Sequence, residues 1–202
     1  MKAPDAGLSG GLLSKSMYDS AECYRRYLDG DEGAAAQLME DVFFGLVYFV
    51  DGYVHDVHTA EDIAMDVMAE LFSRRRKYDS RSSLKTFIYM LGKSRALDHL
   101  KRRKRVEFAP IEAADGVSDE RAQLEDKIVA SERERAVREA VRKLPDDMRE
   151  AVHLIYFEEL SYDEAARVMR KNRKQVDNLL YRAKKELREI IGEGGRELLC
   201  RN

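Results

Sequence analysis

Apolar positions along this chain recur at three- and four-residue spacing, which is the pattern of amphipathic helices. Between residues 31 and 55 they are Ala35, Leu38, Met39, Val42, Phe43, Leu46, Val47 and Val50. Strand signals are weak throughout, because no Asn-Gly or Asp-Gly turn separates two alternating apolar runs. The pattern therefore predicts an all-α protein.

Two further helices are predicted before residue 105. The first begins with Thr59 as its expected N-cap and continues to about Arg76. Its buried face is expected to contain Ile63, Val67 and Leu71. A loop over residues 77–83 then leads into a helix over residues 84–104. The inner face of that helix is expected to contain Leu84, Phe87, Ile88 and Leu91.

Residues 107–118 interrupt the helical pattern. The stretch contains Pro110 and Gly116 and has no periodicity, which favours a flexible linker. Helices are expected again over residues 119–143 and 145–157. The predicted boundaries are 1–18 for an N-terminal extension, 19–105 for a first helical domain, 106–118 for the linker, 119–191 for a second helical domain and 192–202 for a C-terminal tail.

The strongest local signal is the outline of a helix-turn-helix over residues 160–182. Ser161 and Glu164 match a capping box, which opens a short helix that ends near Met169. After a tight turn, a longer basic helix is expected from about Arg173 to Ile191. The spacing favours DNA binding over the alternative, a helical hairpin with a solvated basic face.

The net charge of -2 hides an alternation of charge along the chain. Residues 19–72 carry -11, residues 73–105 carry +11, residues 106–169 carry -8 and residues 170–188 carry +6. Two basic blocks that alternate with two acidic ones predict two separate contacts with a polyanion, with acidic surface left for another partner.

The first basic block has features that suit single-stranded DNA. A loop from Tyr78 to Ser83 precedes Phe87 and Tyr89, and the helix ends in the basic run 101–105. Hydroxyl groups, arginine and aromatic rings beside a basic helix can hold unstacked bases. The spacing fits equally well with Phe87 as an ordinary core residue.

Several classes of protein are disfavoured by composition. No apolar run approaches 18 residues, so no membrane span is expected. The N-terminal residues lack the apolar region of a secretory signal. Cys23 and Cys200 lie far apart, which is not a disulfide framework and favours a reducing cytoplasm.

A metal-dependent enzyme is also disfavoured. His55 and His58 lie near Asp56 and Asp62, but no further ligand stands at metal-site spacing. His99 and His153 are interpreted as ordinary polar residues on helix surfaces. We therefore expect a protein that is not an enzyme and needs no metal and no cofactor.

Taken together, these segments resemble the bacterial sigma-70 family of RNA polymerase factors. The core-binding helix of that family resembles Thr59-Ala-Glu-Asp-Ile-Ala-Met-Asp-Val-Met-Ala-Glu-Leu-Phe72. Its promoter-melting and -10 stretch resembles Tyr78-Asp79, Ser83-Leu-Lys-Thr-Phe-Ile88 and Arg95-Ala-Leu-Asp-His-Leu-Lys-Arg-Arg103. Its -35 binding domain resembles Leu144-Pro-Asp-Asp-Met-Arg-Glu-Ala-Val152, Leu160-Ser-Tyr-Asp-Glu-Ala-Ala166 and Val176-Asp-Asn-Leu-Leu-Tyr-Arg-Ala183.

The resemblance covers residues 19–190, and the spacing between its parts indicates a subgroup. Only 38 residues separate Arg105 from Leu144, too few for a linker and an intervening domain of ordinary size. The chain is therefore similar to the extracytoplasmic-function (ECF) subgroup, which keeps only a region 2-like helical bundle and a region 4-like helix-turn-helix domain.

The resemblance implies a factor that binds core RNA polymerase and directs promoter recognition, DNA melting and transcription initiation. Docking on the clamp helices of the largest polymerase subunit is carried over to Glu61, Asp62, Asp66 and Glu70. Contacts with the -10 element and the melted strand are carried over to Ser80, Arg81, Ser82, Lys85, Phe87, Lys93, Arg95, Lys101, Arg102 and Arg103. Contacts with the -35 element are carried over to Arg173, Lys174, Gln175, Asn178, Tyr181 and Arg182.

Further expectations follow from the resemblance. Arg170 stands where the family often has glycine, so Asn172 is expected to supply a left-handed turn residue. The implied partners are core RNA polymerase, promoter DNA and an anti-sigma factor. The alternative is a stand-alone helix-turn-helix regulator, but the melting loop argues against it because a regulator does not need one.

Overall fold

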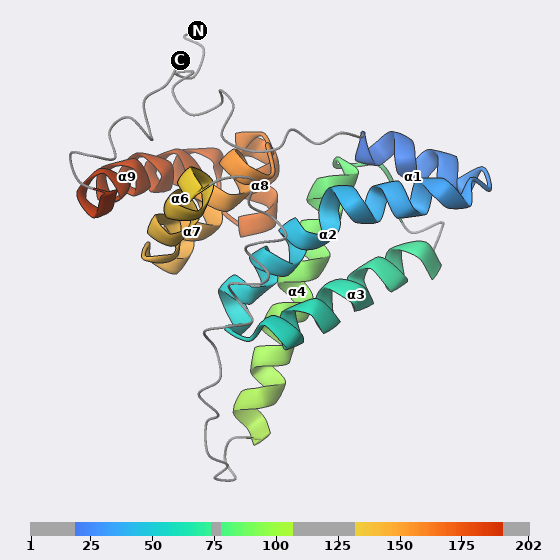
Figure 1. Ribbon diagram of the computed structural model, residues 1–202, viewed down its shortest axis with the longest axis horizontal. Helices are drawn as coiled ribbons and strands as arrows, with labels where there is room; N and C mark the ends of the chain where they lie inside the picture. Colours follow the sequence, from blue (N-terminus) through green and yellow to red (C-terminus); the bar gives the residue numbers. More distant parts are fainter. Residues whose placement is uncertain (1–18, 74–77, 107–131, 192–202) are drawn as a thin grey trace, which may run out of the picture. The chain divides into compact units, whose positions relative to one another are not determined.

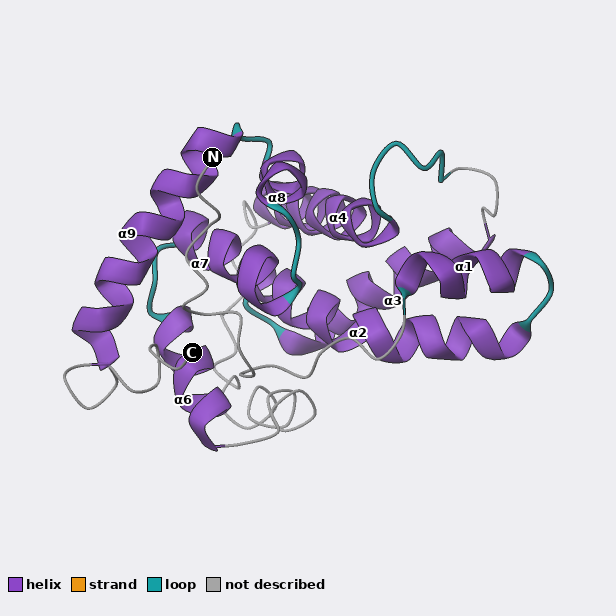
Figure 2. Ribbon diagram, turned by 90° about the horizontal axis from the view of Figure 1, so that it is seen from above, coloured by secondary structure: helices purple, strands orange, loops and turns teal. Residues whose placement is uncertain are grey.

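The computed structural model describes residues 19–73, 78–106 and 132–191. All regular elements in these ranges are helices (Figures 1 and 2), which confirms the prediction of an all-α protein. The helices divide into two compact units. The first contains α1 (Ser20–Leu28), α2 (Glu32–Val54), α3 (Val57–Ser73) and α4 (Leu84–Val106). The second contains α6 (Glu132–Arg142), α7 (Asp146–Val152), the π-helical turn η1 (His153–Phe157), α8 (Tyr162–Met169) and α9 (Arg173–Ile191).

Some sequence predictions fall outside these ranges. The predicted N-terminal extension, most of the linker, the start of the helix expected over residues 119–143 and the C-terminal tail lie outside the described residues. Cys200 lies there as well. Cys23 is buried, and its burial raises the pKa of the thiol.

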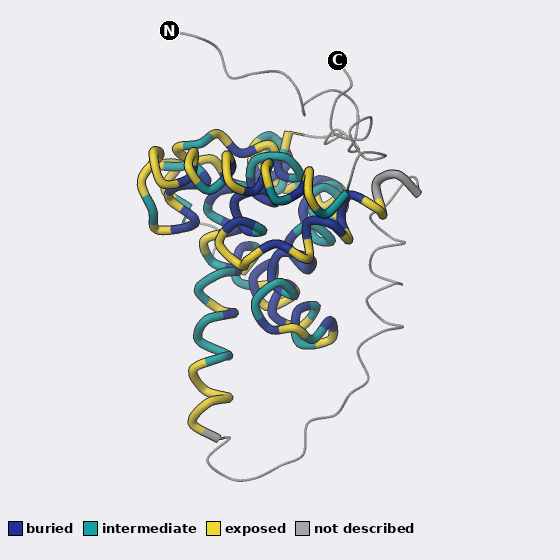
Figure 3. Tube along the Cα trace, turned by 90° about the vertical axis from the view of Figure 1, so that its left-hand side faces the viewer, coloured by how far each residue is buried: buried dark blue, intermediate teal, exposed yellow. Residues whose placement is uncertain are grey.

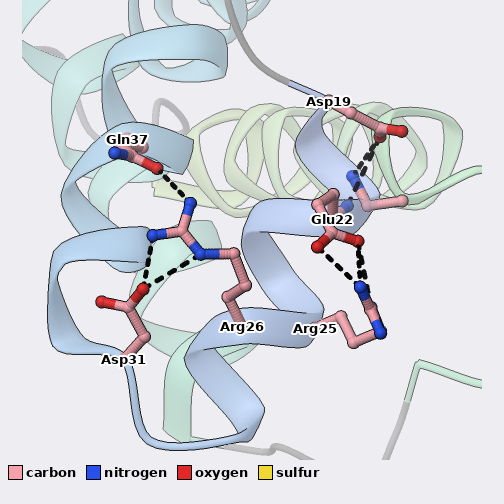
Figure 4. Close-up of polar contacts among 7 residues, drawn as sticks. Asp19, Glu22, Arg25, Arg26, Asp31 and Gln37 are labelled. Atoms are coloured by element: carbon pink, nitrogen blue, oxygen red, sulfur yellow. Dashed lines mark hydrogen bonds and ion pairs between the residues drawn. The ribbon is translucent and has the colours of Figure 1, made fainter.

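The first helix, α1, was not predicted from the sequence. Its N-cap is Asp19, whose carboxylate accepts from the backbone N–H of Ala21 at 2.9 Å. Arg26 then ties α1 to α2, because Nε of Arg26 donates to Oδ2 of Asp31 at 3.0 Å and its Nη1 donates to Gln37 at 2.9 Å (Figure 4). Polar contacts therefore fix the turn between these two helices.

Helix α2 is the centre of the first unit and packs against α1, α3 and α4. Leu38, Val42, Leu46 and Val50 are fully buried along it. At 23 residues, α2 is long and apolar enough to cross a membrane by length and composition alone, a test that the core helix of a helical bundle also passes. Its apolar side chains pack on neighbouring helices, as those of a central bundle helix do.

The beginning of α3 differs from the prediction. The helix starts at Val57, and Oδ2 of Asp56 accepts from the N–H of Thr59 at 2.9 Å, so Thr59 is not the N-cap. His55 ends α2 in the left-handed conformation. His55 therefore closes the end of α2, and Asp56 caps the start of α3. Within the described ranges no group of three or more His, Cys, Asp or Glu side chains is arranged to hold a metal ion.

The second unit also differs from the prediction in one element. The helix expected over residues 145–157 leaves α-helical geometry at His153 and ends in η1. His153 is buried rather than on a helix surface, and its Nε2 lies 3.4 Å from Oε1 of the buried Glu158. Arg138 of α6 stacks on Phe157, with its guanidinium carbon 4.4 Å from the ring centroid. Buried charged side chains thus surround the π-helical turn.

Candidate polymerase and nucleic-acid interfaces

The helix-turn-helix begins with the predicted capping box. Oγ of Ser161 accepts from the N–H of Glu164 at 3.3 Å, and the Glu164 carboxylate accepts from the N–H of Ser161 at 2.9 Å. These two bonds satisfy backbone donors that the first turn of α8 would otherwise leave without partners. The start of α8 is therefore fixed as the sequence predicted.

The turn between α8 and α9 corrects another prediction. Arg170, not Asn172, adopts the left-handed conformation, with φ of 55°. The reason is position, because a left-handed residue closes a helix directly after its last turn, and Met169 is the last residue of α8. Asn172 instead caps α9, since its Oδ1 accepts from the N–H of Gln175 at 2.9 Å.

One face of α9 holds it against the rest of the unit. Val176, Leu180, Ala183 and Leu187 are buried on that face. At the start of the helix, Nη1 of Arg173 donates to Asp163 of α8 at 2.9 Å. The same guanidinium lies 5.6 Å from the ring centroid of Tyr162. Sequence spacing gave no signal for Asp163 and Tyr162, which orient Arg173.

The opposite side of α9 is polar and exposed. All six residues predicted to read the -35 element are exposed: Arg173, Lys174, Gln175, Asn178, Tyr181 and Arg182. Tyr181 is 76% exposed, which is unusual for a large aromatic side chain. Such a surface, with cations, amides and one exposed ring, has the groups needed to contact phosphates and base edges.

In the first unit, the loop before α4 is closed by Tyr78. Its hydroxyl donates to the carbonyl of Ser82 at 2.6 Å, and its ring packs on Phe87 with centroids 5.5 Å apart. Ser80 adopts a left-handed conformation, with φ of 58°. Ser80 and Arg81 are exposed, and Nε of Arg81 lies 3.1 Å from Asp79. The loop therefore exposes hydroxyl groups and one cation, and it is supported by the packed rings of Tyr78 and Phe87.

Helix α4 combines a buried beginning with an exposed basic end. Leu84 and Ile88 are buried as predicted, but Phe87 and Leu91 are only partly buried, and Tyr89 is fully buried instead. The buried face of α4 therefore differs from the predicted one. The reason is that α1, α2 and α3 all contact α4, so more than one side of the helix is covered. Residues 101–105 are exposed, and the last turns of α4 project beyond the other helices of the unit (Figures 1 and 3).

The other predicted DNA-contacting residues of α4 lie on different sides of the helix. Lys93 has its ammonium group 5.7 Å from the ring centroid of Tyr53 in α2. Lys85 is partly exposed, and Lys101 lies 3.5 Å from Asp98. Arg95 faces α3, where its guanidinium pairs with Glu70.

Helix α3 exposes an acidic face. Asp62 and Asp66 are exposed, Glu61 is partly exposed, and Met65 between them is 53% exposed. Glu70 differs from these residues, because its side chain is only 19% exposed and pairs with Arg95. The exposed methionine makes this face amphipathic and suits a protein partner more than DNA.

Known families match both units of the chain. The model of sigma-70 region 2 matches residues 45–106, and the model of sigma-70 region 4 matches residues 134–187. The first match includes the acidic face of α3 and the basic end of α4. The second includes the complete helix-turn-helix.

Curated relatives agree with these matches. The chain is 28% identical over 175 residues to the RNA polymerase sigma-H factor of Pseudomonas aeruginosa, which covers 80% of this chain and 88% of that protein. It is 27% identical over 147 residues to the RNA polymerase sigma factor YlaC of Bacillus subtilis, covering 71% and 83%. It is 25% identical over 178 residues to the ECF RNA polymerase sigma factor SigW of Bacillus subtilis, covering 80% and 91%.

Solved structures share the fold. CnrH, solved in complex with the cytosolic domain of CnrY, aligns with a TM-score of 0.57 and 16% identity, covering 86% of this chain and 97% of that chain. The sigma factor RpoE of Bartonella quintana, solved with the anti-sigma factor NepR, aligns with a TM-score of 0.55 and 20% identity, covering 77% and 95%. With both sigma regions matched in order, the chain belongs to the sigma-70 family and is a sigma factor of the ECF type.

Proposed function

We propose that this chain binds core RNA polymerase, selects promoters through their -35 and -10 elements and opens the duplex for transcription initiation. The observation that carries the proposal is the order of the two matches, region 2 on the first helical unit and region 4 on the second. The polymerase supplies the chemistry of RNA synthesis, and this chain supplies binding alone. It acts in the cytoplasm, where the polymerase works.

Polymerase docking is assigned to the acidic face of α3. Its exposed carboxylates, Asp62 and Asp66, flank the exposed Met65. The family resemblance carries the same contact to Glu61 and Glu70, at the two ends of this face. Carboxylates on this face repel DNA and attract a basic protein surface. The contact with the clamp helices of the largest polymerase subunit is therefore expected to weaken at high salt.

Melting is assigned to the loop at residues 78–83 and to α4. Flipping a base out of the duplex costs a few kcal/mol, and stacking on an aromatic side chain returns about 1–3 kcal/mol per base. The nearby cations hold the backbone while this exchange takes place. The residues that the family resemblance carries to this role are Ser80, Arg81, Ser82, Lys85, Phe87, Lys93, Arg95, Lys101, Arg102 and Arg103.

Reading of the -35 element is assigned to the exposed side of α9. Arginine and lysine prefer the acceptors of guanine, and asparagine pairs with adenine. The ring of Tyr181 can contact a thymine methyl group. The proposed residues are Arg173, Lys174, Gln175, Asn178, Tyr181 and Arg182.

We also propose the domain limits and a regulatory partner. The limits are 19–105 for the region 2 domain and 119–191 for the region 4 domain, with 106–118 as the linker. Because one related structure is of a sigma factor bound to an anti-sigma factor, an anti-sigma factor that covers the DNA-reading surfaces is the expected regulator.

Run-off transcription tests the proposal. Sigma-free bacterial core polymerase is combined with the purified chain and sheared DNA from the source genome, and transcripts are mapped at their 5′ ends. Discrete starts that require the chain are expected, with two shared sequence elements upstream. If the chain produced no transcript starts and also did not co-purify with core polymerase, the proposal would be contradicted. That outcome would favour a stand-alone helix-turn-helix regulator.

A further inference from the structure

An ion pair joins the docking helix α3 to the promoter helix α4. Nη2 of Arg95 donates to Oε2 of Glu70, and the two side chains are 45% and 19% exposed. The family resemblance gives these residues different partners, a DNA phosphate for Arg95 and the polymerase for Glu70. In the folded chain, however, each residue engages the other.

The charges around Arg95 are unfavourable for a phosphate. The pKa of its guanidinium is raised, first by the hydrogen bond to Glu70, with smaller contributions from the carboxylates of Asp66 and Asp98. A phosphate that approached Arg95 would be repelled by these three carboxylates as well as attracted by the guanidinium. The basic run at residues 101–105, at the exposed end of the same helix, offers a more positive surface.

The position of Arg95 around the helix points to the same conclusion. Arg95 and Lys93 are two residues apart in α4, so their side chains leave the helix axis about 200° apart. Lys93 lies over Tyr53 of α2, whereas Arg95 lies against α3 beside an open hollow of about 340 Å³ lined by Asp66, Ala69, Glu70 and Ser73. A DNA strand that ran along the Lys93 side of α4 would therefore not reach Arg95, whose side chain leaves the opposite side of the helix.

We propose that Glu70 and Arg95 are positioning residues whose ion pair sets the orientation of the promoter helix α4 relative to the docking helix α3. The proposal rests on the proposed function of the two helices. It removes Glu70 from the polymerase contact and Arg95 from the phosphate contacts. Asp62 and Asp66 are then the principal docking carboxylates, and Lys93 is a phosphate contact.

Salt dependence separates a positioning residue from a phosphate contact. Polymerase reconstituted with the full chain is bound to a promoter fragment mapped by run-off transcription, at a series of salt concentrations. Log affinity falls with log salt, and each lost phosphate contact makes this fall less steep. The magnitude of the slope decreases by about 0.9 for duplex DNA or about 0.7 for a single strand.

Lys93→Ala serves as the positive control and is expected to lower this slope by that amount. Arg95→Ala is expected to leave the slope unchanged while it lowers the yield of starts roughly two- to fivefold, the range of a partly exposed ion pair. A slope that falls as much for Arg95→Ala as for Lys93→Ala would overturn the proposal, because it would make Arg95 a phosphate contact.

Reversal of the pair tests whether the two residues act through each other. Glu70→Arg and Arg95→Glu should each lower the yield of starts, and the double variant should recover at least part of it. A double variant as weak as the two effects combined would overturn the proposal. A thermal unfolding cycle on the same full-length variants, without polymerase, shows whether the pair couples the two positions in the free chain.

Glu70→Gln provides a second variant in case the reversed pair does not fold. Its affinity for core polymerase should stay near that of the wild type, whereas Asp66→Asn, at the same hollow, should lower the affinity. Equal losses for the two variants would return Glu70 to the docking surface and overturn the proposal. A wild-type chain that gives no starts would instead overturn the proposed function, and the unfolding cycle would still report the coupling of the pair.

Discussion

Asn172 and Gln175 cap the helix α9 reciprocally. The N–H of Gln175 donates to Oδ1 of Asn172 at 2.9 Å, and the N–H of Asn172 donates to Oε1 of Gln175 at 2.8 Å. Gln175 was predicted to read the -35 element, yet in the folded chain its side chain stabilises the beginning of α9, the helix to which that reading is assigned. Exposure alone therefore does not make it a base contact.

The first prediction separates these two roles of Gln175. Gln175→Ala removes one half of the cap and should lower the free energy of unfolding by about 0.5–2 kcal/mol, the usual range for a lost cap. Gln175→Glu should keep the cap, because a carboxylate accepts the same backbone bond. Thermal unfolding of the full chain measures both changes. A change of -35 base preference in Gln175→Glu, at unchanged stability, would show that the side chain reads a base.

The helix-turn-helix was predictable because its signals are local. The capping box of Ser161 and Glu164 and the basic helix from Arg173 depend on residues a few positions apart, and the structure confirmed both. The left-handed residue was misassigned to Asn172, because residue preference favoured asparagine while the actual helix end required that conformation at Arg170. The position of the helix end therefore decides which residue is left-handed, whatever the conformational preference of its neighbours.

A second prediction concerns the close approach of α4 to α2. A Cβ atom added to Gly92 would lie 2.7 Å from Cδ1 of Leu46, a fully buried side chain. Gly92→Ala gains helix propensity, but the overpacked contact should outweigh this gain and destabilise the first unit by about 1–3 kcal/mol. Chemical denaturation measures the change. Combining it with Leu46→Ala should recover space for the methyl group, so a double variant without any recovery would contradict the explanation.

A third prediction concerns pH and the turn between α1 and α2. The pKa of Asp31 is lowered, first by its hydrogen bond from Arg26. A carboxyl group whose folded pKa is lowered contributes stability above its unfolded pKa, near 4, and loses that contribution as pH falls through the folded value. Asp31→Asn should therefore lower the melting temperature at pH 7 and make little difference at the acid end. Gln37→Ala, which removes a neutral contact of Arg26, serves as the control with a pH-independent effect.

The candidate interfaces were predictable in outline but not in their internal pairing. The acidic face of α3 and the exposed side of α9 follow from helical periodicity, which assigns side chains to faces. The ion pairs of Arg95 with Glu70 and of Arg173 with Asp163 join different helices. Such contacts depend on how helices pack, and no spacing within one helix encodes them.

The last prediction concerns Tyr181, whose ring is 76% exposed on α9. Because this ring contributes little to the core, Tyr181→Ala should leave the melting temperature of the chain nearly unchanged. On a mapped promoter it should weaken recognition of the -35 element by about 1–3 kcal/mol, the cost of one mismatched base pair. Tyr181→Phe should retain most of the activity if the ring contacts a thymine methyl group, and should lose it if the hydroxyl is the essential group. Transcription from fragments with an intact and a scrambled -35 element makes the comparison. Equal losses on both fragments would show that Tyr181 acts elsewhere than in -35 reading.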